Sequence, residues 1–286
     1  MRKCIGLELL AAMSDRSKIL FVVEGRKRER QLVERLAEVF GFSAKLYTVN
    51  GNIYSLYQAV KKDLYAEIVQ VLLGMDNSES DKTILANRFT DIFLVFDCDA
   101  QHTMNRDEVS SMSPKEIAQR NMMLIREMAE RFDESTDPLR GKLLVNYPMV
   151  ESFRDCDDFF DVSYENSEVA IDDLTTYKSR VGGRKLARFH LKDYTEGNFR
   201  DLILMNLCKL NKIMRDRFAP CGYEEFLSLN DQVQIAEAES TLVAERSILS
   251  VLNTLLFFPL EYFGEVGGFY SKLQTAKFEA KKGAYG

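Results

Sequence analysis

Three acidic residues, Glu24, Asp97 and Asp99, have the types and surroundings needed to hold a divalent cation. Asp97 and Asp99 are two residues apart, so their side chains point to the same side of an extended chain. Two carboxylates this close repel each other unless a cation lies between them. Mg²⁺ suits such a pair because it takes oxygen ligands, uses few carboxylates and keeps several waters. The pair therefore indicates a Mg²⁺ site, and the plainer interpretation is a pair that caps a loop or the next helix.

Glu24 adds a third acid from a distant part of the sequence. It follows the apolar run 18–23 directly and precedes Gly25. Glycine at that place lets the backbone turn sharply and leaves room for a phosphate. The helix expected after the turn would offer its N-terminal amides to an anion. Taken alone, the same residues also fit an ordinary strand-to-helix turn with a solvated acid.

The elements that must position these acids follow from the hydrophobic pattern. Short apolar runs predict strands, and apolar residues at helical spacing predict helices. The predicted strands are 18–23, 44–49, 91–96 and 142–146, and the predicted helices are 27–40, 53–71 and 113–132, with a loop over 76–83. Strands that alternate with helices predict an α/β fold with a parallel sheet flanked by helices. Ligands of such sheets lie beyond the carboxyl ends of the strands, where Glu24, Asp97 and Asp99 stand.

The pattern changes after about residue 147, where helical spacing takes over. Helices are predicted over 198–218, 224–229 and 240–258. The most hydrophobic stretch, 248–263, is predicted to be a buried helix, because it is too short and too interrupted to span a bilayer. We therefore predict two regions, an α/β catalytic domain over 1–150 and a helical C-terminal region over 151–286.

Composition excludes several classes of protein. The chain has 286 residues and a net charge of -6, which argues against coating nucleic acid by bulk charge but is compatible with a local basic groove. Its five cysteines are scattered without a C-x-x-C pair, which indicates reduced thiols and no structural zinc site. No signal peptide and no membrane association are predicted, so we expect a cytoplasmic protein. No P-loop sequence is present, so the chain is not itself a P-loop ATPase.

Two sequence segments together resemble the Toprim domain, which occurs in primases, topoisomerases, recombination factors and a group of nucleases. They are V-V-E-G at 22–25 and V-F-D-C-D at 95–99, and the resemblance covers residues 16–150. It implies a Toprim-like parallel sheet, with Glu24 as a general acid/base or metal ligand. It also implies that Asp97 and Asp99 bind Mg²⁺, with Mn²⁺ as a substitute. Accessory regions like those of gyrases or primases are absent, which points to the small nuclease branch.

The chain departs from that branch at one place and resembles one of its subgroups at another. Many of these nucleases carry V-E-G-x-x-[ED], whereas Arg28 stands at the second acid here and Glu29 follows it. The pattern therefore does not support a two-metal mechanism. The segment V-N-Y-P-M-V-E-S-F at 145–153 resembles one in the AriB-type Toprim nucleases of the PARIS anti-phage system. Its Glu151 either approaches the strand-end site as a further metal ligand or stabilises the start of a helix.

Basic residues provide the counterpart that a phosphodiester substrate requires, because cations hold the phosphates that flank the reacting one. Candidates around the Glu24 turn are Arg26, Lys27 and Arg28. A second cluster contains Lys178, Arg180, Arg184, Lys185, Arg188 and Lys192. Tyr177 and Phe189 lie near the second cluster and could stack on bases. A solvated charged loop or helix is the other interpretation of that cluster.

We therefore predict a Mg²⁺-dependent endonuclease. The resemblance implies an RNA substrate, tRNA in particular, in preference to DNA, and an anti-phage effector held in check by an ABC-type ATPase partner. The sequence leaves open whether the chain forms a homo-oligomer. One rival is a haloacid-dehalogenase-like phosphatase, but its D-x-D should lie on the first strand and precede Thr or Val, whereas Ala100 and Gln101 follow here. The other rival is a non-catalytic Toprim-like binding or regulatory subunit, favoured by the displaced Glu29.

Overall fold

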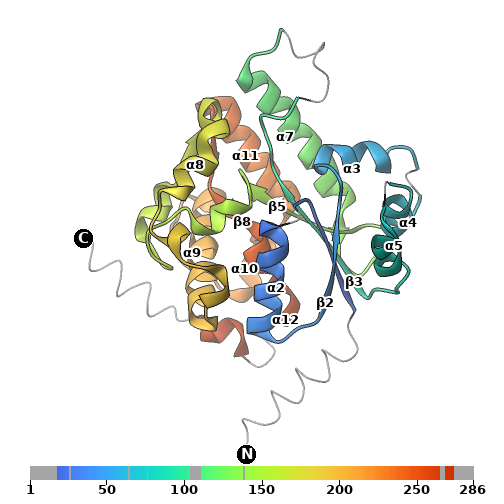
Figure 1. Ribbon diagram of the computed structural model, residues 1–286. Helices are drawn as coiled ribbons and strands as arrows, with labels where there is room; N and C mark the ends of the chain where they lie inside the picture. Colours follow the sequence, from blue (N-terminus) through green and yellow to red (C-terminus); the bar gives the residue numbers. More distant parts are fainter. Residues whose placement is uncertain are drawn as a thin grey trace, which may run out of the picture.

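The computed structural model describes residues 18–25, 27–63, 65–75, 77–103, 111–137, 139–264 and 268–273. A six-stranded sheet lies at the centre, in the order β2-β1-β3-β5-β4, and β8 also pairs with β5 (Figure 1). β2, β1, β3 and β5 are parallel, while β4 and β8 run antiparallel to β5. The strands are β1 Ile19–Val23, β2 Ala44–Thr48, β3 Asp91–Asp97, β4 Asp133–Glu134, β5 Gly141–Tyr147 and β8 Leu252–Asn253. The predicted α/β fold with a mostly parallel sheet flanked by helices is confirmed.

The central strands form because their side chains are apolar on both faces. Every residue of β1 is buried, and so are Ile92 to Phe96 of β3. Near-continuous apolar runs of this kind are typical of parallel strands that are covered on both sides. Val23 pairs with Val95, and β3 continues for two residues beyond that pair. This register brings the residue after β1 next to the end of β3.

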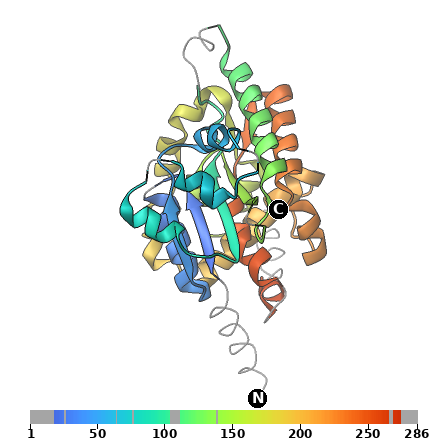
Figure 2. The ribbon, with the colours of Figure 1, turned by 90° about the vertical axis from the view of Figure 1, so that its right-hand side faces the viewer.

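Helices of the N-terminal half follow the strands of the sheet. They are α2 Arg28–Phe40, α3 Ile53–Val60, α4 Ile68–Leu73, α5 Glu79–Leu85 and α7 Pro114–Arg131. Ser113 starts α7 with a reciprocal cap, since its hydroxyl accepts from the Glu116 amide and Glu116 accepts from the Ser113 amide. Helix α7 packs along α11, and both views show the two helices side by side (Figure 2).

The C-terminal half is mainly helical and also supplies short strands. Its α-helices are α8 Tyr177–Gly182, α9 Glu196–Arg215, α10 Tyr223–Leu229, α11 Gln232–Arg246 and α12 Phe258–Phe263. Its 3₁₀ turns are η1 Val150–Arg154, η2 Val162–Asn166, η3 Ile171–Thr176, η4 Leu186–Arg188, η5 Leu191–Asp193, η6 Thr254–Phe257 and η8 Tyr270–Lys272. β6 Glu168–Ala170 and β7 Ile248–Ser250 form a separate antiparallel pair. No helix among the described residues combines the length and apolar character that crossing a bilayer requires.

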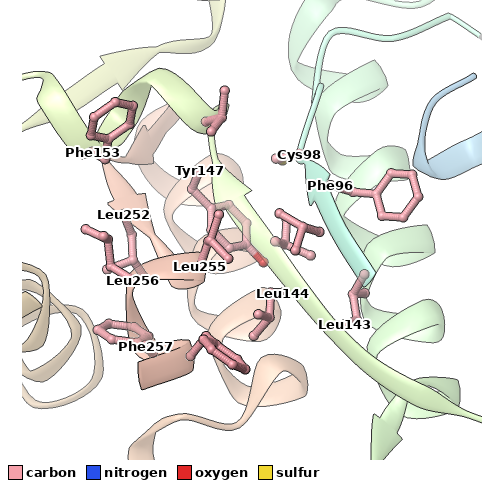
Figure 3. Packing of buried hydrophobic residues seen from close by; sticks show 14 of the residues in the cluster. Phe96, Cys98, Leu143, Leu144, Tyr147, Phe153, Leu252, Leu255, Leu256 and Phe257 are labelled. Atoms are coloured by element: carbon pink, nitrogen blue, oxygen red, sulfur yellow. The ribbon is translucent and has the colours of Figure 1, made fainter. Parts of the chain in front are cut away.

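One hydrophobic core contains residues from both sides of residue 150. Leu144 and Tyr147 of β5 lie near Leu252, Leu255 and Leu256 from the C-terminal half (Figure 3). β8 adds hydrogen bonds to this packing, because Asn253 pairs with β5 and its side-chain amide donates to the Val150 carbonyl at 3.0 Å and to Ser152 Oγ at 3.1 Å. The C-terminal half is thereby fixed to the turn that follows β5.

Two expectations for the segment between β2 and β3 were wrong. The single helix predicted over 53–71 is two helices, because Lys61, Lys62 and Asp63 interrupt the apolar spacing with exposed polar residues. The loop predicted over 76–83 contains the start of α5. The Ser78 hydroxyl accepts from the Asp81 amide while Asp81 accepts from the Ser78 amide, and this reciprocal cap starts a helix within a polar sequence.

The helix predicted over 240–258 was also wrong. α11 begins earlier, at Gln232, and ends at Arg246, where Ser247 adopts a left-handed backbone with φ 56°. A left-handed residue just after the last turn is a common way for a helix to end. The chain then forms β7, β8 and η6 before α12, so the stretch 248–263 is not one buried helix.

Candidate active site

Glu24 and Asp97 meet at the carboxyl ends of β1 and β3. The Glu24 amide donates to the Val95 carbonyl at 3.3 Å, which extends the pairing of the two strands by one residue. Glu24 Oε2 accepts a hydrogen bond from the Asp97 amide at 3.2 Å. The Glu-Gly turn and the Asp-x-Asp segment, 73 residues apart, are therefore joined directly.

The Asp97 carboxylate links β3 to the turn after β5. Its Oδ1 accepts from the Val150 amide at 2.7 Å and lies 3.4 Å from Asn146 Nδ2. Burial raises the pKa of Asp97 well above its usual value, and the charges of Glu29 and Glu24 raise it further. Asp97 thus has two donors for one of its oxygens, while acidic neighbours disfavour its charge.

Asp99 lies in a tightly held turn directly after β3. Its backbone has φ 42°, a left-handed conformation that aspartate tolerates better than most residues. Tyr54 Oη donates to the Cys98 carbonyl at 2.8 Å, and Asn121 Nδ2 donates to the Ala100 carbonyl at 2.8 Å. Burial raises the pKa of Asp99. Hydrogen bonds to the carbonyls of Cys98 and Ala100 thus fix the backbone on both sides of Asp99 in this strained conformation, and strained residues of this kind are common at functional sites.

Glu29 belongs to the same group of acids, although it stands one position later than in related patterns. It lies in the first turn of α2, and only 6% of its surface is exposed. Its carboxylate folds back over Gly25, where a Cβ atom would stand 1.9 Å from Glu29 Oε2. The Glu29 charge raises the pKa of both Asp97 and Glu24. Glycine at position 25 therefore makes room for the second acid.

Glu151 is the fifth acid of the group. It is 1% exposed on η1, and its Oε1 lies 3.0 Å from Lys178 Nζ while it makes no hydrogen bond. Its charge raises the pKa of Glu29 and of Asp97. We call the five residues the acidic edge, and they are Glu24, Glu29, Asp97, Asp99 and Glu151.

The electrostatics of the acidic edge favour cation binding. Burial raises the pKa of Glu24 from 4.5 to about 8, the charge of Asp99 adds to this, and the hydrogen bond from Asp97 only partly opposes it. Lys178 lies among these carboxylates and lowers the pKa of Glu29 and Asp99. Carboxylates that repel each other in this way hold protons unless another cation takes their place. With all five carboxylates ionised, the acidic edge would therefore carry more negative charge than its basic neighbours balance.

The acidic edge provides oxygen ligands alone, which suits Mg²⁺ or Mn²⁺ rather than zinc. Within the described residues, no three His, Cys, Asp or Glu side chains are spaced as the ligands of one metal ion. Mg²⁺ is commonly held by one or two carboxylates and several waters. Glu24, Asp97 and Asp99 are the acids from which such a pair would come, and the buried Glu151 carboxylate, which is paired with Lys178, lies near them.

The predicted cations lie in different places. Arg26 falls outside the described residues. Lys27 is exposed before α2, and Arg28 is half-buried and lowers the pKa of Glu29. Lys178 reaches Glu151, as described above, and Lys185 is exposed. Lys178 and Arg28 are thus the cations nearest to the acids.

Arg180 and Arg184 have a structural partner that the sequence did not indicate. They contact the buried Asp155 carboxylate at 2.7 Å and 2.9 Å. This pairing fixes α8 and its following loop to the end of η1.

His102 helps to hold the turn that contains Asp99. It stacks on the Tyr54 ring, with ring centroids 5.1 Å apart and planes 4° from parallel, and both of its ring nitrogens lie 3.2 Å from Asn52 Nδ2.

No family model, curated protein or solved structure matches this chain. What the chain does has to follow from the chemistry of the acidic edge.

Proposed function

We propose that this protein is a Mg²⁺-dependent nuclease of the Toprim type, which hydrolyses phosphodiester bonds at the acidic edge. The observation that carries the proposal is the hydrogen bond from the Asp97 amide to Glu24 Oε2. It joins the two segments that resemble the Toprim domain at one end of a parallel sheet. Burial and like charge raise the pKa of Glu24 and Asp97 there, as expected for carboxylates that receive a cation.

Three residues of the acidic edge and two nearby cations have roles in this proposal. Asp97 and Asp99 would hold Mg²⁺, which would supply a Lewis acid for a phosphate oxygen and a bound water of lowered pKa. Glu24 Oε2 is held by the Asp97 amide, so we assign Oε1 as the oxygen that accepts the proton of the attacking water. Lys178 and Arg28 hold phosphates of the substrate and offset the charge that develops during the reaction.

The resemblance of residues 145–153 to AriB-type nucleases supports a more specific proposal. We infer that the substrate is RNA, tRNA in particular, in preference to DNA. The protein would act in the cytoplasm as an effector of anti-phage defence, and an ABC-type ATPase partner would restrain it until infection. The Glu151 carboxylate of that segment lies at the acidic edge, where its charge raises the pKa of Asp97.

The two rival functions receive less support. A non-catalytic subunit was favoured by a missing second acid, but Glu29 lies over Gly25 among the other acids. A phosphatase would use Asp97 as its nucleophile, yet Asp97 Oδ1 accepts a 2.7 Å hydrogen bond from the Val150 amide. A phosphate group trapped on Asp97 would revive the phosphatase.

The test is cleavage by the purified protein with Mg²⁺, using total tRNA, single-stranded RNA and plasmid DNA. Glu24→Gln and Asp97→Asn keep the size of each side chain and remove its charge. We expect both variants to lose roughly three orders of magnitude of activity or more. The matched control is Glu67→Gln, which removes an exposed carboxylate before α4 that makes no capping hydrogen bond. The proposal fails if Glu24→Gln cleaves as fast as Glu67→Gln.

A further inference from the structure

A second site lies beside the acidic edge. It is a pocket of about 510 Å³ between α2, η1 and the segment from η4 to η5. Its lining includes basic and aromatic residues, among them Arg28, Arg35, Arg154, Arg188, Phe189 and Lys192. We call this site the basic pocket. Arg28 and Arg35 are seven residues apart on α2, which is about two turns, so they lie on the same side of the helix.

The basic pocket and the acidic edge share two elements, α2 and η1. Arg28 precedes Glu29 on α2, and Arg154 follows Glu151 by three residues on η1. The charge of Arg28 lowers the pKa of Glu29 and also lowers that of Arg154. A chain-like substrate that leaves the acidic edge along η1 would therefore enter the basic pocket.

The cations of the basic pocket have few partners within the protein. Arg154 Nε is buried without a hydrogen bond. Burial lowers the pKa of Arg154, and the charge of the neighbouring Arg28 adds a smaller contribution in the same direction. Among the described residues, no carboxylate lies within salt-bridge distance of Arg28, Arg188 or Lys192. Two guanidinium groups whose charges repel each other and an unused buried donor are what an anion such as a phosphate would satisfy.

The two acids that also line the basic pocket do not cancel this charge. Glu34 is 2.9 Å from Arg30, and Glu38 is 2.6 Å from Arg35. Each acid is therefore paired within its own helix. The excess of positive charge belongs to Arg28, Arg154, Arg188 and Lys192.

Phe189 gives the basic pocket an aromatic surface. Its side chain is 55% exposed, which is unusual for a phenylalanine. One side of the ring meets the Phe159 ring at 5.8 Å and 62°, in an edge-to-face contact. Phe189 and Arg188 both line the pocket, and base–aromatic stacking beside cations is how single strands are commonly held.

We propose that the basic pocket binds one unpaired nucleotide of a single-stranded nucleic acid, next to the bond that is cut. Its phosphate would contact Arg28, Arg154 and Arg188, and its base would stack on Phe189. The proposal rests on the proposed nuclease function for the position of the strand. A base within a duplex is already stacked and cannot reach the ring, so single strands, loops and bulges are the ligands that fit.

The test measures binding apart from cleavage, in a buffer without divalent cations. Fluorescence anisotropy follows a labelled single-stranded RNA, and separately the same RNA annealed to its complement. We expect Phe189→Ala to weaken single-strand binding roughly 5- to 150-fold. We expect Arg188→Ala to reduce the dependence of log affinity on log salt by about 0.7. Both residues are exposed, so thermal unfolding should be unchanged in each variant.

The matched control is Arg88→Ala. Arg88 is an exposed arginine that precedes β3 and so lies at the opposite, amino end of the sheet. We expect it to bind single strands as the wild type does. Phe189→Leu, which keeps apolar packing against Phe159 but loses the aromatic face, should bind about as weakly as Phe189→Ala.

Two results would overturn the basic pocket as a nucleotide site. One is single-strand binding by Phe189→Ala and Arg188→Ala that equals the Arg88→Ala control. The other is an equal loss of binding for single strand and duplex. The cleavage assay tests the nuclease proposal separately. If Glu24→Gln loses cleavage but the pocket variants bind normally, the proposed nuclease function stands and the proposed nucleotide site is wrong. If Glu24→Gln still cleaves but the pocket variants bind weakly, the nucleotide site stands and the proposed nuclease function is wrong.

Discussion

Glu151 and Asp155 are four residues apart, both are almost fully buried, and their charges are balanced in different ways. Asp155 has two guanidinium partners, Arg180 and Arg184, one on each oxygen. Glu151 belongs to the acidic edge, where five carboxylates have Lys178 and Arg28 as their nearest cations. The comparison separates an acid that holds the fold together from acids that, in the proposed function, hold a metal ion. Burial alone does not distinguish the two, whereas the local balance of charge does.

The largest expected effect tests the acidic edge. Asp97→Asn should lower the cleavage rate roughly 1000-fold or more. Its stability should change by less than about 1 kcal/mol in metal-free buffer, because the amide oxygen still accepts from Val150 and one repelling charge is gone. Cleavage rates and urea unfolding of the same preparation measure both. A strongly destabilised but active variant would mean that the acidic edge is structural.

Asp155, the acid that is paired with two arginines, should show a large effect on stability. Asp155→Asn should destabilise the protein by about 4 kcal/mol, because two guanidinium groups lose their buried partner. Asp172→Asn, on the exposed part of η3, serves as the matched control and should be nearly neutral. Urea unfolding gives both values. A small effect at Asp155 would show that its pairing with two arginines contributes little.

A third buried acid sharpens the comparison through its pH dependence. Glu239 is fully buried, accepts from the Ser250 amide at 2.9 Å, and burial raises its pKa from 4.5 to about 7. The folded state therefore binds a proton that the unfolded state has released between these two values. The contribution of Glu239 to the free energy of unfolding is fully present below pH 4.5. It is lost as the pH rises from 4.5 to about 7, and the loss is at most about 3 kcal/mol.

Glu239→Gln should remove this contribution, because glutamine accepts the same hydrogen bond without titrating. The free energy of unfolding should fall less between about pH 5 and about pH 8 in the variant than in the wild type. The difference between the two proteins isolates Glu239 from the acidic edge, which titrates in both. Identical pH profiles would mean that Lys209, whose charge favours ionised Glu239, neutralises it fully.

The smallest effect concerns the space over Gly25. In Gly25→Ala the new methyl group must displace the Glu29 carboxylate. The end of a flexible side chain can move cheaply, so we expect a stability change below about 1 kcal/mol. Cleavage should fall roughly 10- to 100-fold, because the second acid is misplaced. Gly182→Ala, where a Cβ meets nothing within 4 Å, should leave the cleavage rate unchanged.

The sequence predicted the parts of the structure that depend on local pattern. Continuous apolar runs located β1 and β3, and parallel pairing then required Glu24 and Asp97 to lie at the same end of the sheet. It did not predict how far a side chain would fold back. Glu29 seemed displaced in the sequence, but it reaches the other acids because residue 25 has no side chain in its path.

Contacts between distant segments explain the remaining differences. Arg180 and Arg184 looked like free cations, since nothing in their own segment reveals a partner at Asp155. The segment after Ser247 was predicted to be helical from its apolar content. It forms β7 and β8 instead, because β6 and β5 are available to pair with it. Such pairing depends on strands about 80 to 100 residues away, which periodicity cannot detect.

The pairing of β8 with β5 has a mechanical consequence. Asn253 is bonded to the carbonyl of Val150 and the hydroxyl of Ser152, the two neighbours of Glu151. A displacement of the last third of the chain would therefore shift Glu151 relative to Glu24 and Asp97. Under the proposed function, a molecule bound to α11 or α12 that moved β8 would change the rate of hydrolysis without contacting the substrate.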